Sequence, residues 1–389
     1  MRLSVVVPAY NSAGTIGPCL DGLAVALGPN DEVIVVDDGS TDDTLDIVIG
    51  YPDPRVSGLR LDLNVGRGPA RNHGANKATG DVLVFVDADV VVHPDAADLL
   101  RSAFTDDGLA AVFGSYDSEP AAPGLTSQFR NLLHHHTHHH LAEQSPTASH
   151  FWTGLGAIST SAFHEVGGFD EDRWARNMED VELGHRLNDA GHAVHVRPAV
   201  QGTHLKGYSL LSMVRSDLFD RAIPWTHLML ADHRADRFVV SLQRCAPPAA
   251  AALASIAAIG ALFLPIMWLG VLAMLLIGAG LSGDVWRTFR AHRGAGFAVA
   301  AIPLLYLHHL VATVGLGLGL LTAARSTSPA RELTTRGRPD RTRRARHRRT
   351  DAATALDAGQ AAHPTLDGDA NTQGGLSRSG NEVVTNDFD

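Results

Sequence analysis

The chain has 389 residues, 45% of them hydrophobic, and a formal net charge of −10 at pH 7. Its length allows a catalytic domain of ordinary size with further segments, and its charge identifies no partner because an acidic first part offsets ten arginines between Arg325 and Arg349. The two cysteines, Cys19 and Cys245, are too far apart in sequence for a disulfide framework or a zinc motif, which favours a reducing compartment.

Short apolar runs alternate with helical segments over residues 1–110. Three near-continuous apolar runs end in polar or acidic residues, as parallel strands covered on both faces do: 3–10, 31–38 and 81–89. Helical spacing predicts helices between them, over 16–27, 44–49 and 69–78. This alternation predicts a doubly wound α/β sheet, whose ligands bind beyond the carboxyl ends of the strands. The first run reaches Pro8 too soon for a signal peptide, so we expect this domain in the cytosol.

The middle of the chain continues the mixed pattern. A helix is predicted over 125–141, a strand over 151–159, and a glycine-rich loop before a helix over 179–190. Residues 204–245 contain amphipathic pieces suited to a membrane surface.

Two blocks without charged residues, 247–281 and 297–321, predict C-terminal transmembrane helices. About 20 apolar residues span a bilayer, so the first block is barely long enough for a tight hairpin bent at Pro265, and the second is a single span. After Thr350 the chain is rich in Gly, Ala, Asp and Asn and is predicted to be disordered.

The arginines make the number of spans ambiguous. Arg287, Arg290 and Arg293 lie between the two apolar blocks, and the ten further arginines follow the second block. The positive-inside rule places both groups in the cytosol. With a cytosolic catalytic domain, two spans satisfy the later arginines and three satisfy the earlier ones. A broken or re-entrant first block would satisfy both.

Two aspartates interrupt the apolar run LVFVDADVVV at residues 83–92. Burial of unpaired carboxylates is costly, so a partner is expected for Asp87 and Asp89. Two carboxylates one residue apart at a strand end point the same way, and their oxygens suit a hard cation such as Mg²⁺ or Mn²⁺. Alternatively, Asp89 caps a helix that starts near Pro94.

Further segments support a sugar-nucleotide site. VVDDGSTDDT places an aspartate pair before a Gly-Ser-Thr turn, and NVGRGPARNHGANKATGD supplies Arg71 and Asn72 ahead of the strand that bears Asp87. With PAYNSAGTIGPCL and FVDADVV, these segments resemble the nucleotide-sugar-binding half of family 2 glycosyltransferases with the GT-A fold, in particular bacterial membrane-anchored members. FWTGLGAISTSAFHEVGGFDE, MEDVELGHRL and THLKGYSL resemble the acceptor region of that family, so the likeness covers roughly residues 3–230.

The resemblance implies a role for each of several residues. Asp180 is the general base of an inverting transfer, taking the proton of the acceptor hydroxyl. The other roles are donor binding by Pro8, Tyr10, Asp38, Arg71 and Asp87, metal binding by Asp89, Asp87 and His204, and an acceptor side with Trp152, Gly154 and Glu179. The metal, Mg²⁺ or Mn²⁺, neutralises the departing diphosphate.

Structural roles are the alternatives for these residues. Pro8 ends a strand, Asp38 opens a turn, Arg71 is solvated on a helix, His204 is simply hydrogen-bonded, and Glu179 with Asp180 forms an ordinary acidic helix start. The helix start also favours ionised Asp180, so desolvation from nearby aromatic residues, Phe151, Trp152 or Trp174, would have to raise its pKa. His134 and His138 are four residues apart, but we expect the 134–140 run to lie on an acceptor-side or membrane-facing helix rather than to bind metal.

The predicted organisation follows from these features. It is a GT-A domain (1–230, halves 1–115 and 116–230), an interfacial segment (231–246), a transmembrane region (247–322) and a basic then disordered tail (323–389). The predicted function is transfer of a single sugar, from a UDP-sugar as first choice, to a hydroxyl of a membrane lipid or lipid-linked glycan at the plasma membrane, with no nucleic-acid partner. RAIPW at 221–225 stands where polymerising members carry QxxRW, which disfavours polymerisation.

The sequence leaves three alternatives to this predicted function. A polyprenyl-phosphate acceptor is already anionic and needs no base. A nucleotidyltransferase should carry a basic phosphate loop after its first strand, whereas PAYNSAGT has no basic residue. A non-catalytic scaffold that binds sugar nucleotides would not require the full set of acidic residues.

Overall fold

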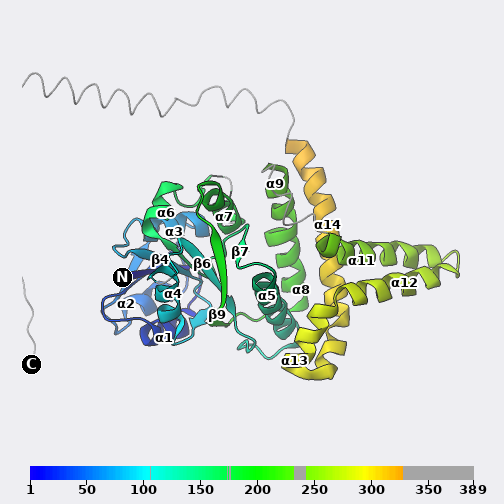
Figure 1. Cartoon of the computed structure of the whole chain (residues 1–389), viewed down its shortest axis with the longest axis horizontal. Helices are drawn as coiled ribbons and strands as arrows, with labels where there is room; N and C mark the ends of the chain where they lie inside the picture. The colour runs from blue at the N-terminus through cyan, green and yellow to red at the C-terminus, as the bar shows by residue number, and fades with distance from the viewer. Residues whose placement is uncertain (106, 173, 175–176, 232–241, 327–389) are drawn as a thin grey trace, which may run out of the picture. The chain divides into compact units, whose positions relative to one another are not determined.

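A nine-stranded mixed sheet organises the first part of the chain in this computed structural model, which describes residues 1–389 except 106, 173, 175–176, 232–241 and 327–389 (Figure 1). The strand order is β3-β2-β1-β4-β8-β6-β9-β5, with β7 paired to β9. Strands β1 to β4 are parallel, β8 is antiparallel to β4 and β6, and β9 is parallel to β6. The strands are β1 (Leu3–Ala9), β2 (Glu32–Asp37), β3 (Val56–Arg60), β4 (Val82–Val86), β5 (Val90–Val92), β6 (Ala111–Tyr116), β7 (Thr147–Ala148), β8 (Leu155–Ser159) and β9 (Val194–His204).

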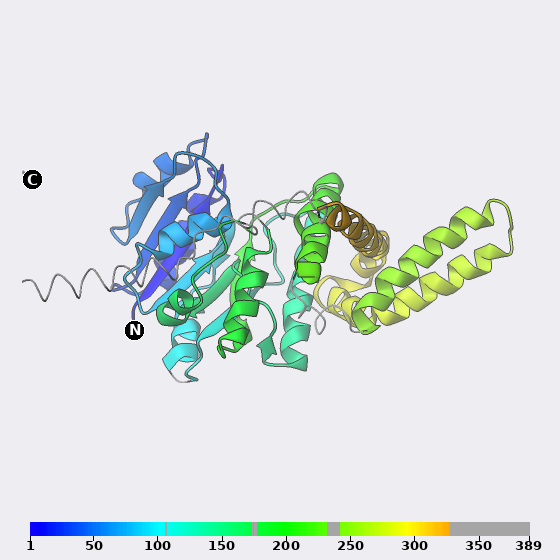
Figure 2. The ribbon, with the colours of Figure 1, turned by 90° about the horizontal axis from the view of Figure 1, so that it is seen from above.

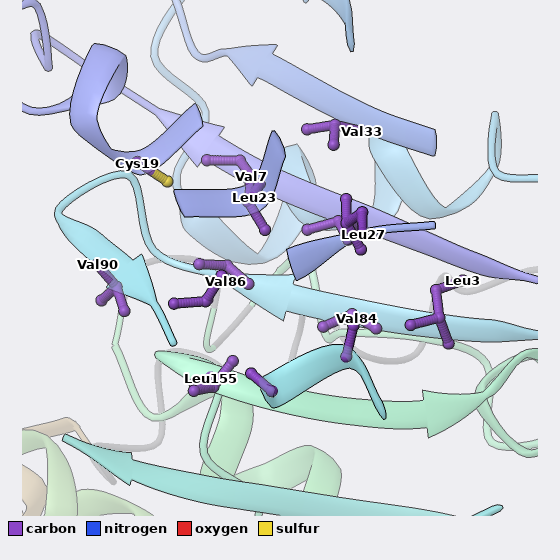
Figure 3. Close-up of a cluster of buried hydrophobic side chains, with 14 of the residues drawn as sticks. Leu3, Val7, Cys19, Leu23, Leu27, Val33, Val84, Val86, Val90 and Leu155 are labelled. Carbon is purple, nitrogen blue, oxygen red and sulfur yellow. The ribbon is translucent and has the colours of Figure 1, made fainter. Parts of the chain in front are cut away.

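Helices cover both faces of this sheet. Successive side chains of a strand point to opposite faces, so Leu3, Val5 and Val7 enter one core while Val6 enters the other. Figure 3 shows part of the first core, where Leu23 and Cys19 pack against strand residues. The helices of this region are α1 (Ile16–Ala26), α2 (Thr44–Ile49), α3 (Arg67–Ala75), α4 (Ala96–Thr105), α5 (Leu125–Gln144), α6 (Thr160–Glu165) and α7 (Glu179–Asp189). The predicted α/β sheet is confirmed.

The run at residues 83–92 is not one strand. β4 ends at Val86, and β5 begins at Val90 in a different place, antiparallel to β9. The two aspartates lie in the turn between the strands, where the backbone N–H of Val90 donates to the carbonyl of Asp87. Both carboxylates therefore lie outside the interior of the sheet.

The second part of the described chain is helical. One continuous helix, which we call the 210–231 helix, comprises α8 (Leu210–Arg215), a π-helical stretch η1 (Ser216–Ala222) and α9 (Ile223–Ala231). It is followed by α11 (Leu242–Ala261), α12 (Met267–Leu281), α13 (Gly283–Ala300) and α14 (Ile302–Ser326). The turn between α11 and α12 contains Pro265, the residue at which the sequence predicted a bend (Figures 1 and 2).

Among the described helices, α14 is long and apolar enough to cross a membrane over Ile302–Ala323. Helices α12 and α13 pass the same test only as a pair, and they are bent by 66° relative to each other. The predicted span over 297–321 is divided at Ala301, where α13 ends and α14 begins.

Close packing joins α14 to the 210–231 helix. A Cβ atom added to Gly315 would lie 2.3 Å from Cβ of Ala222, and one added to Gly319 would lie 2.5 Å from Cβ of Thr226. These contacts run in parallel along both helices, so glycines spaced four apart allow the backbones to approach closely. Residues 327–389, which include most of the predicted basic tail, lie outside the described residues.

Candidate active site

A buried arginine connects two acidic residues at one end of the sheet. Arg71 in α3 is fully buried, donates from Nη2 to Oδ1 of Asp87 at 2.7 Å, and donates from Nη1 to Oε1 of Glu179 at 2.8 Å. The Phe169 ring lies 5.7 Å from its guanidinium carbon. The described contacts of Arg71 therefore fix the turn after β4 relative to the start of α7. The sequence predicted a donor-binding role for this residue.

The start of α7 has an unusual backbone. Met178, the residue before Glu179, has a φ of 66°, a conformation that non-glycine residues adopt rarely and mostly at constrained sites. Glu179 is 2% exposed, and its Oε2 has no hydrogen-bond partner among the described residues. Nε of Arg67 lies 3.5 Å from Oε1 of Glu179, and this carboxylate raises the pKa of Arg67. Two arginines thus face one buried glutamate.

Asp180 lies in the first turn of α7, where the helix dipole alone would lower its pKa. Burial, reinforced by the negative charge of Glu179, instead raises the pKa of Asp180 to about 6, although Arg71 and Arg67 act in the opposite direction. Oδ2 accepts from the backbone N–H and the hydroxyl of Thr153 at 3.4 and 3.3 Å. Both contacts are long and leave an oxygen able to accept a proton near neutral pH.

The second aspartate of the turn faces a different partner. Oδ2 of Asp89 lies 3.6 Å from Nε2 of His204, because β5 and β9 pair Val90 with His204. Burial disfavours ionised Asp89, but the close polar contact with His204 and the charges of His204 and Lys206 outweigh it and lower the pKa of Asp89. The His204 ring stacks on Tyr116 with centroids 4.2 Å apart. His204 is therefore held in place beside Asp89.

The divergence of the aspartates bears on metal binding. Asp87 contacts Arg71 and Asp89 contacts His204, whereas the sequence had suggested that both carboxylates point the same way. Within the described residues, no three His, Cys, Asp or Glu side chains are grouped so as to hold a metal ion. Asp89 and His204 offer one oxygen and one nitrogen donor, a pair that fits Mg²⁺ or Mn²⁺ if other ligands come from elsewhere.

The predicted donor rim lies where β1 and β2 end. Pro8 is buried within β1, and Tyr10 after the strand is 48% exposed. The two carboxylate oxygens of Asp38 accept from the backbone N–H groups of Val65 and Gly66 at 2.8 and 2.9 Å. Asp38 thereby fixes the loop that leads into α3.

Trp152 and Gly154 lie beside the turn that carries the aspartates. The carbonyl of Gly154 accepts from the N–H of Asp87 at 3.3 Å, and a Cβ atom on Gly154 would come within 2.3 Å of the Trp152 ring. The Trp152 ring contacts Tyr116 at a centroid distance of 4.9 Å. Glycine is therefore required where the indole covers the backbone.

The histidine run has a structural role in α5. Nδ1 of His135 lies 2.9 Å from the carbonyl of Tyr116, and Nδ1 of His138 lies 3.0 Å from that of Gly114. Burial, helped by His150, lowers the pKa of His138 to about 3. The rings of His134 and His138 pack on Trp152, and His135 and His138 contact carbonyls of β6.

Three site residues were missed by the sequence analysis. Arg67, Thr153 and Lys206 lie beside predicted residues, and Arg67 belongs to the GRGPARN segment that was quoted for Arg71. Sequence position could have identified both cations, because Arg67 lies four positions before Arg71 and Lys206 lies two positions after His204. No sequence pattern marks Thr153 as the partner of a carboxylate 27 residues later.

Comparison with known proteins shows the family and the fold that this chain resembles. A family model described as Glycosyl transferase family 2 matches residues 4–167. The chain carries a family 2 glycosyltransferase domain. It is 31% identical over 229 residues to validoxylamine A glucosyltransferase of Streptomyces hygroscopicus subsp. limoneus, covering 49% of this chain and 48% of the relative. It is 44% identical over 93 residues to the succinoglycan biosynthesis protein ExoO of Rhizobium meliloti (strain 1021), covering 24% of this chain and 27% of the relative.

A solved structure extends the likeness of the family 2 domain in fold. The mannosyltransferase PcManGT from Pyrobaculum calidifontis, in complex with GDP-Man and Mn²⁺, superposes with a TM-score of 0.51 at 18% identity, covering 84% of this chain and 88% of that one. The shared sheet is of the GT-A type. The chain spans about half or less of the length of the two curated relatives.

Proposed function

We propose that this family 2 protein transfers a single sugar, with inversion, from a nucleotide sugar to a hydroxyl of a membrane lipid or lipid-linked glycan. A UDP-sugar is the first choice of donor. The apolar C-terminal helices suit a bilayer, which supports attachment to the plasma membrane. The catalytic domain would lie on the cytosolic side. The proposal goes beyond the relatives, since each covers only part of this chain.

The observation that carries the proposal is the environment of Asp180. In an inverting transfer, the acceptor oxygen forms a bond to the anomeric carbon as the bond to the nucleotide diphosphate breaks. The diphosphate leaves with the electron pair, and a carboxylate takes the acceptor proton. A carboxylate with a pKa of about 6 is still ionised at pH 7 yet binds a proton better than an ordinary aspartate.

The surrounding residues would hold Asp180 and the donor in place. Arg71 and Glu179 fix the start of α7, and the half-exposed Arg67 can approach a diphosphate. Lys206 is exposed two residues after His204 and offers a second cation. Tyr10 is exposed at the rim where a base and ribose would lie.

The metal would be held by Asp89 and His204. Neither residue is fully exposed, and their separation of 3.6 Å allows both to face one ion. The diphosphate of the donor and water would complete the ligand set. When bound, Mg²⁺ or Mn²⁺ neutralises charge on the departing diphosphate. The solved mannosyltransferase, which is in complex with GDP-Man and Mn²⁺, is consistent with this assignment.

The test is transfer from labelled UDP- and GDP-sugars in membranes that contain the protein, followed by lipid extraction. Label should enter the lipid phase with wild type and with Asp98→Asn, a control at a side chain that is 88% exposed on α4. Asp180→Asn should retain donor binding and lose transfer. Label confined to the aqueous phase would contradict the lipid acceptor. Transfer by Asp180→Asn at the wild-type rate would instead favour an acceptor that is already anionic, such as a polyprenyl phosphate.

A further inference from the structure

The hairpin of α11 and α12 has an apolar surface that faces solvent. No charged residue occurs between Pro247 and Leu281. Exposure is greatest at the tip, where the large apolar side chains are Leu262 (76%), Phe263 (85%), Leu264 (55%), Ile266 (62%), Trp268 (54%) and Leu269 (63%). A continuous apolar surface on a soluble protein marks an interaction site, and the lack of any polar rim at this tip favours hydrocarbon as its partner.

The hairpin is too short to cross a bilayer and return. Helix α12 has 15 residues, which corresponds to about 22 Å at a rise of about 1.5 Å per residue, against about 30 Å of hydrocarbon. A chain that enters the bilayer along α11 and leaves it along α12 would therefore begin and end on the same side of the membrane.

Contacts after the hairpin place α13 beside the catalytic domain. Arg293 in α13 donates to Oε1 of Gln128 at 2.8 Å and forms an ion pair with Glu119 at 2.9 Å. Phe289 is fully buried against Phe129 of α5, with ring centroids 5.7 Å apart. The chain thus returns from the hairpin to the domain that it left.

Helix α14 also lies beside the catalytic domain. It packs along the 210–231 helix, in which Asp217 pairs with Arg130 at 2.8 Å and lies 2.8 Å from Nδ1 of His308 in α14. A spanning α14 would carry its partner helix, with Asp217, Asp220 and Arg221, into hydrocarbon, where charged side chains are costly. The hairpin projects away from α14 in both views (Figures 1 and 2).

From these contacts we propose that the α11–α12 hairpin inserts into the cytosolic leaflet and returns, while α13 and α14 stay on the cytosolic side. This inference rests on the membrane location in the proposed function. It also places both arginine groups, 287–293 and 325–349, on the side that the positive-inside rule requires. Arg287 and Arg290, which are exposed on α13 after the hairpin, would contact anionic headgroups.

Cysteine labelling tests the sidedness in the full-length chain. Cysteines would be introduced one at a time at Leu264, Asp284 and Asp389 in a Cys245→Ser background, in which the buried Cys19 is the remaining native cysteine. Each variant, and the background without an added cysteine, would be treated with an impermeant maleimide in right-side-out and inverted membrane vesicles. Asp284→Cys and Asp389→Cys should react only in inverted vesicles, and Leu264→Cys in neither. Reaction of Leu264→Cys in right-side-out vesicles would show that the hairpin crosses. Reaction of Asp389→Cys there would show that α14 crosses. Either result overturns the inference.

Binding to the bilayer is tested with purified protein and vesicles of phosphatidylethanolamine and phosphatidylglycerol. A variant with Leu262→Asp and Phe263→Asp should bind these vesicles at least about tenfold more weakly than wild type. Val25→Asp, at a residue 69% exposed on α1, is the control and should bind as wild type does. If the double variant binds the vesicles as tightly as wild type does, the bilayer is refuted as the partner of the hairpin. This conclusion holds whether or not the substitutions also abolish dimerisation of the protein in detergent. Because neither assay uses catalysis, failed sugar transfer would leave these results intact.

Discussion

Replacement of Gly315 by alanine tests whether α14 and the 210–231 helix form a close-packed pair. The new methyl group would lie 2.3 Å from Cβ of Ala222, whereas ordinary contacts begin at 3.4 Å, so the helices must separate. Such overpacking typically costs about 1–3 kcal/mol. Without that contact, alanine in a helix would be roughly 1 kcal/mol more favourable than glycine. The same substitution at Gly317, where an added Cβ atom would have no described neighbour within 4 Å outside its own helix backbone, is therefore a matched control.

The assay is thermal unfolding of the full-length chain in detergent. Gly315→Ala should lower the midpoint by a few degrees, Gly317→Ala should leave it unchanged or raise it, and Gly315→Ala combined with Ala222→Gly should recover most of the loss. Equal midpoints for Gly315→Ala and Gly317→Ala would refute the packing argument. Failure of Ala222→Gly to restore stability would refute the assigned contact.

This packing should also affect catalysis. Trp225 of the 210–231 helix belongs to a buried cluster with Trp174 and Met178, the residue that precedes the acidic pair of α7. Displacement of this helix would therefore disturb Asp180 while leaving the donor rim intact. We expect Gly315→Ala to reduce turnover more than donor binding, with turnover recovering in the combined variant.

Three further predictions concern the charges of the site. Glu179→Gln removes a negative charge that raises the pKa of Asp180, so the acidic limb of the pH–rate profile should move to lower pH, and an unmoved limb would contradict the coupling. His204→Ala should raise the Mn²⁺ concentration needed for half-maximal donor binding, measured by calorimetry, and an unchanged requirement would exclude His204 as a ligand. Arg71→Met leaves two acidic residues without their buried partner and should lower the unfolding midpoint, whereas Arg67→Met, at a half-exposed side chain, should lower it far less.

Much of the sheet could be predicted because burial of both faces leaves a direct signal in sequence. The apolar runs located β1, β2 and β4 to within a residue at their starts, and the family resemblance directed attention to His204 and Asp89. The pairing of β5 with β9, which brings these two residues together, has no local signature. Register between strands that are distant in sequence is a property of the folded chain.

The environments of charged residues were harder to predict. Nothing in a helical segment distinguishes a solvated arginine from Arg71, which is fully buried between carboxylates from two other elements. The pKa of Asp180 depends in the same way on burial that only tertiary packing creates. In the C-terminal region, composition predicted the hairpin at Pro265, whereas the division at Ala301 and the contacts of Gly315 depend on helix packing.

The central claim is that Asp180 accepts the proton of the acceptor, and the pH dependence of transfer at saturating donor tests it most directly. A base must be ionised, and this carboxyl becomes protonated as the pH falls through about 6. The rate of sugar transfer should therefore be constant near neutral pH, reach half its maximum near pH 6, and decline tenfold for each further unit of acidification. A rate that stays constant down to pH 4.5, with donor still bound, would contradict the account.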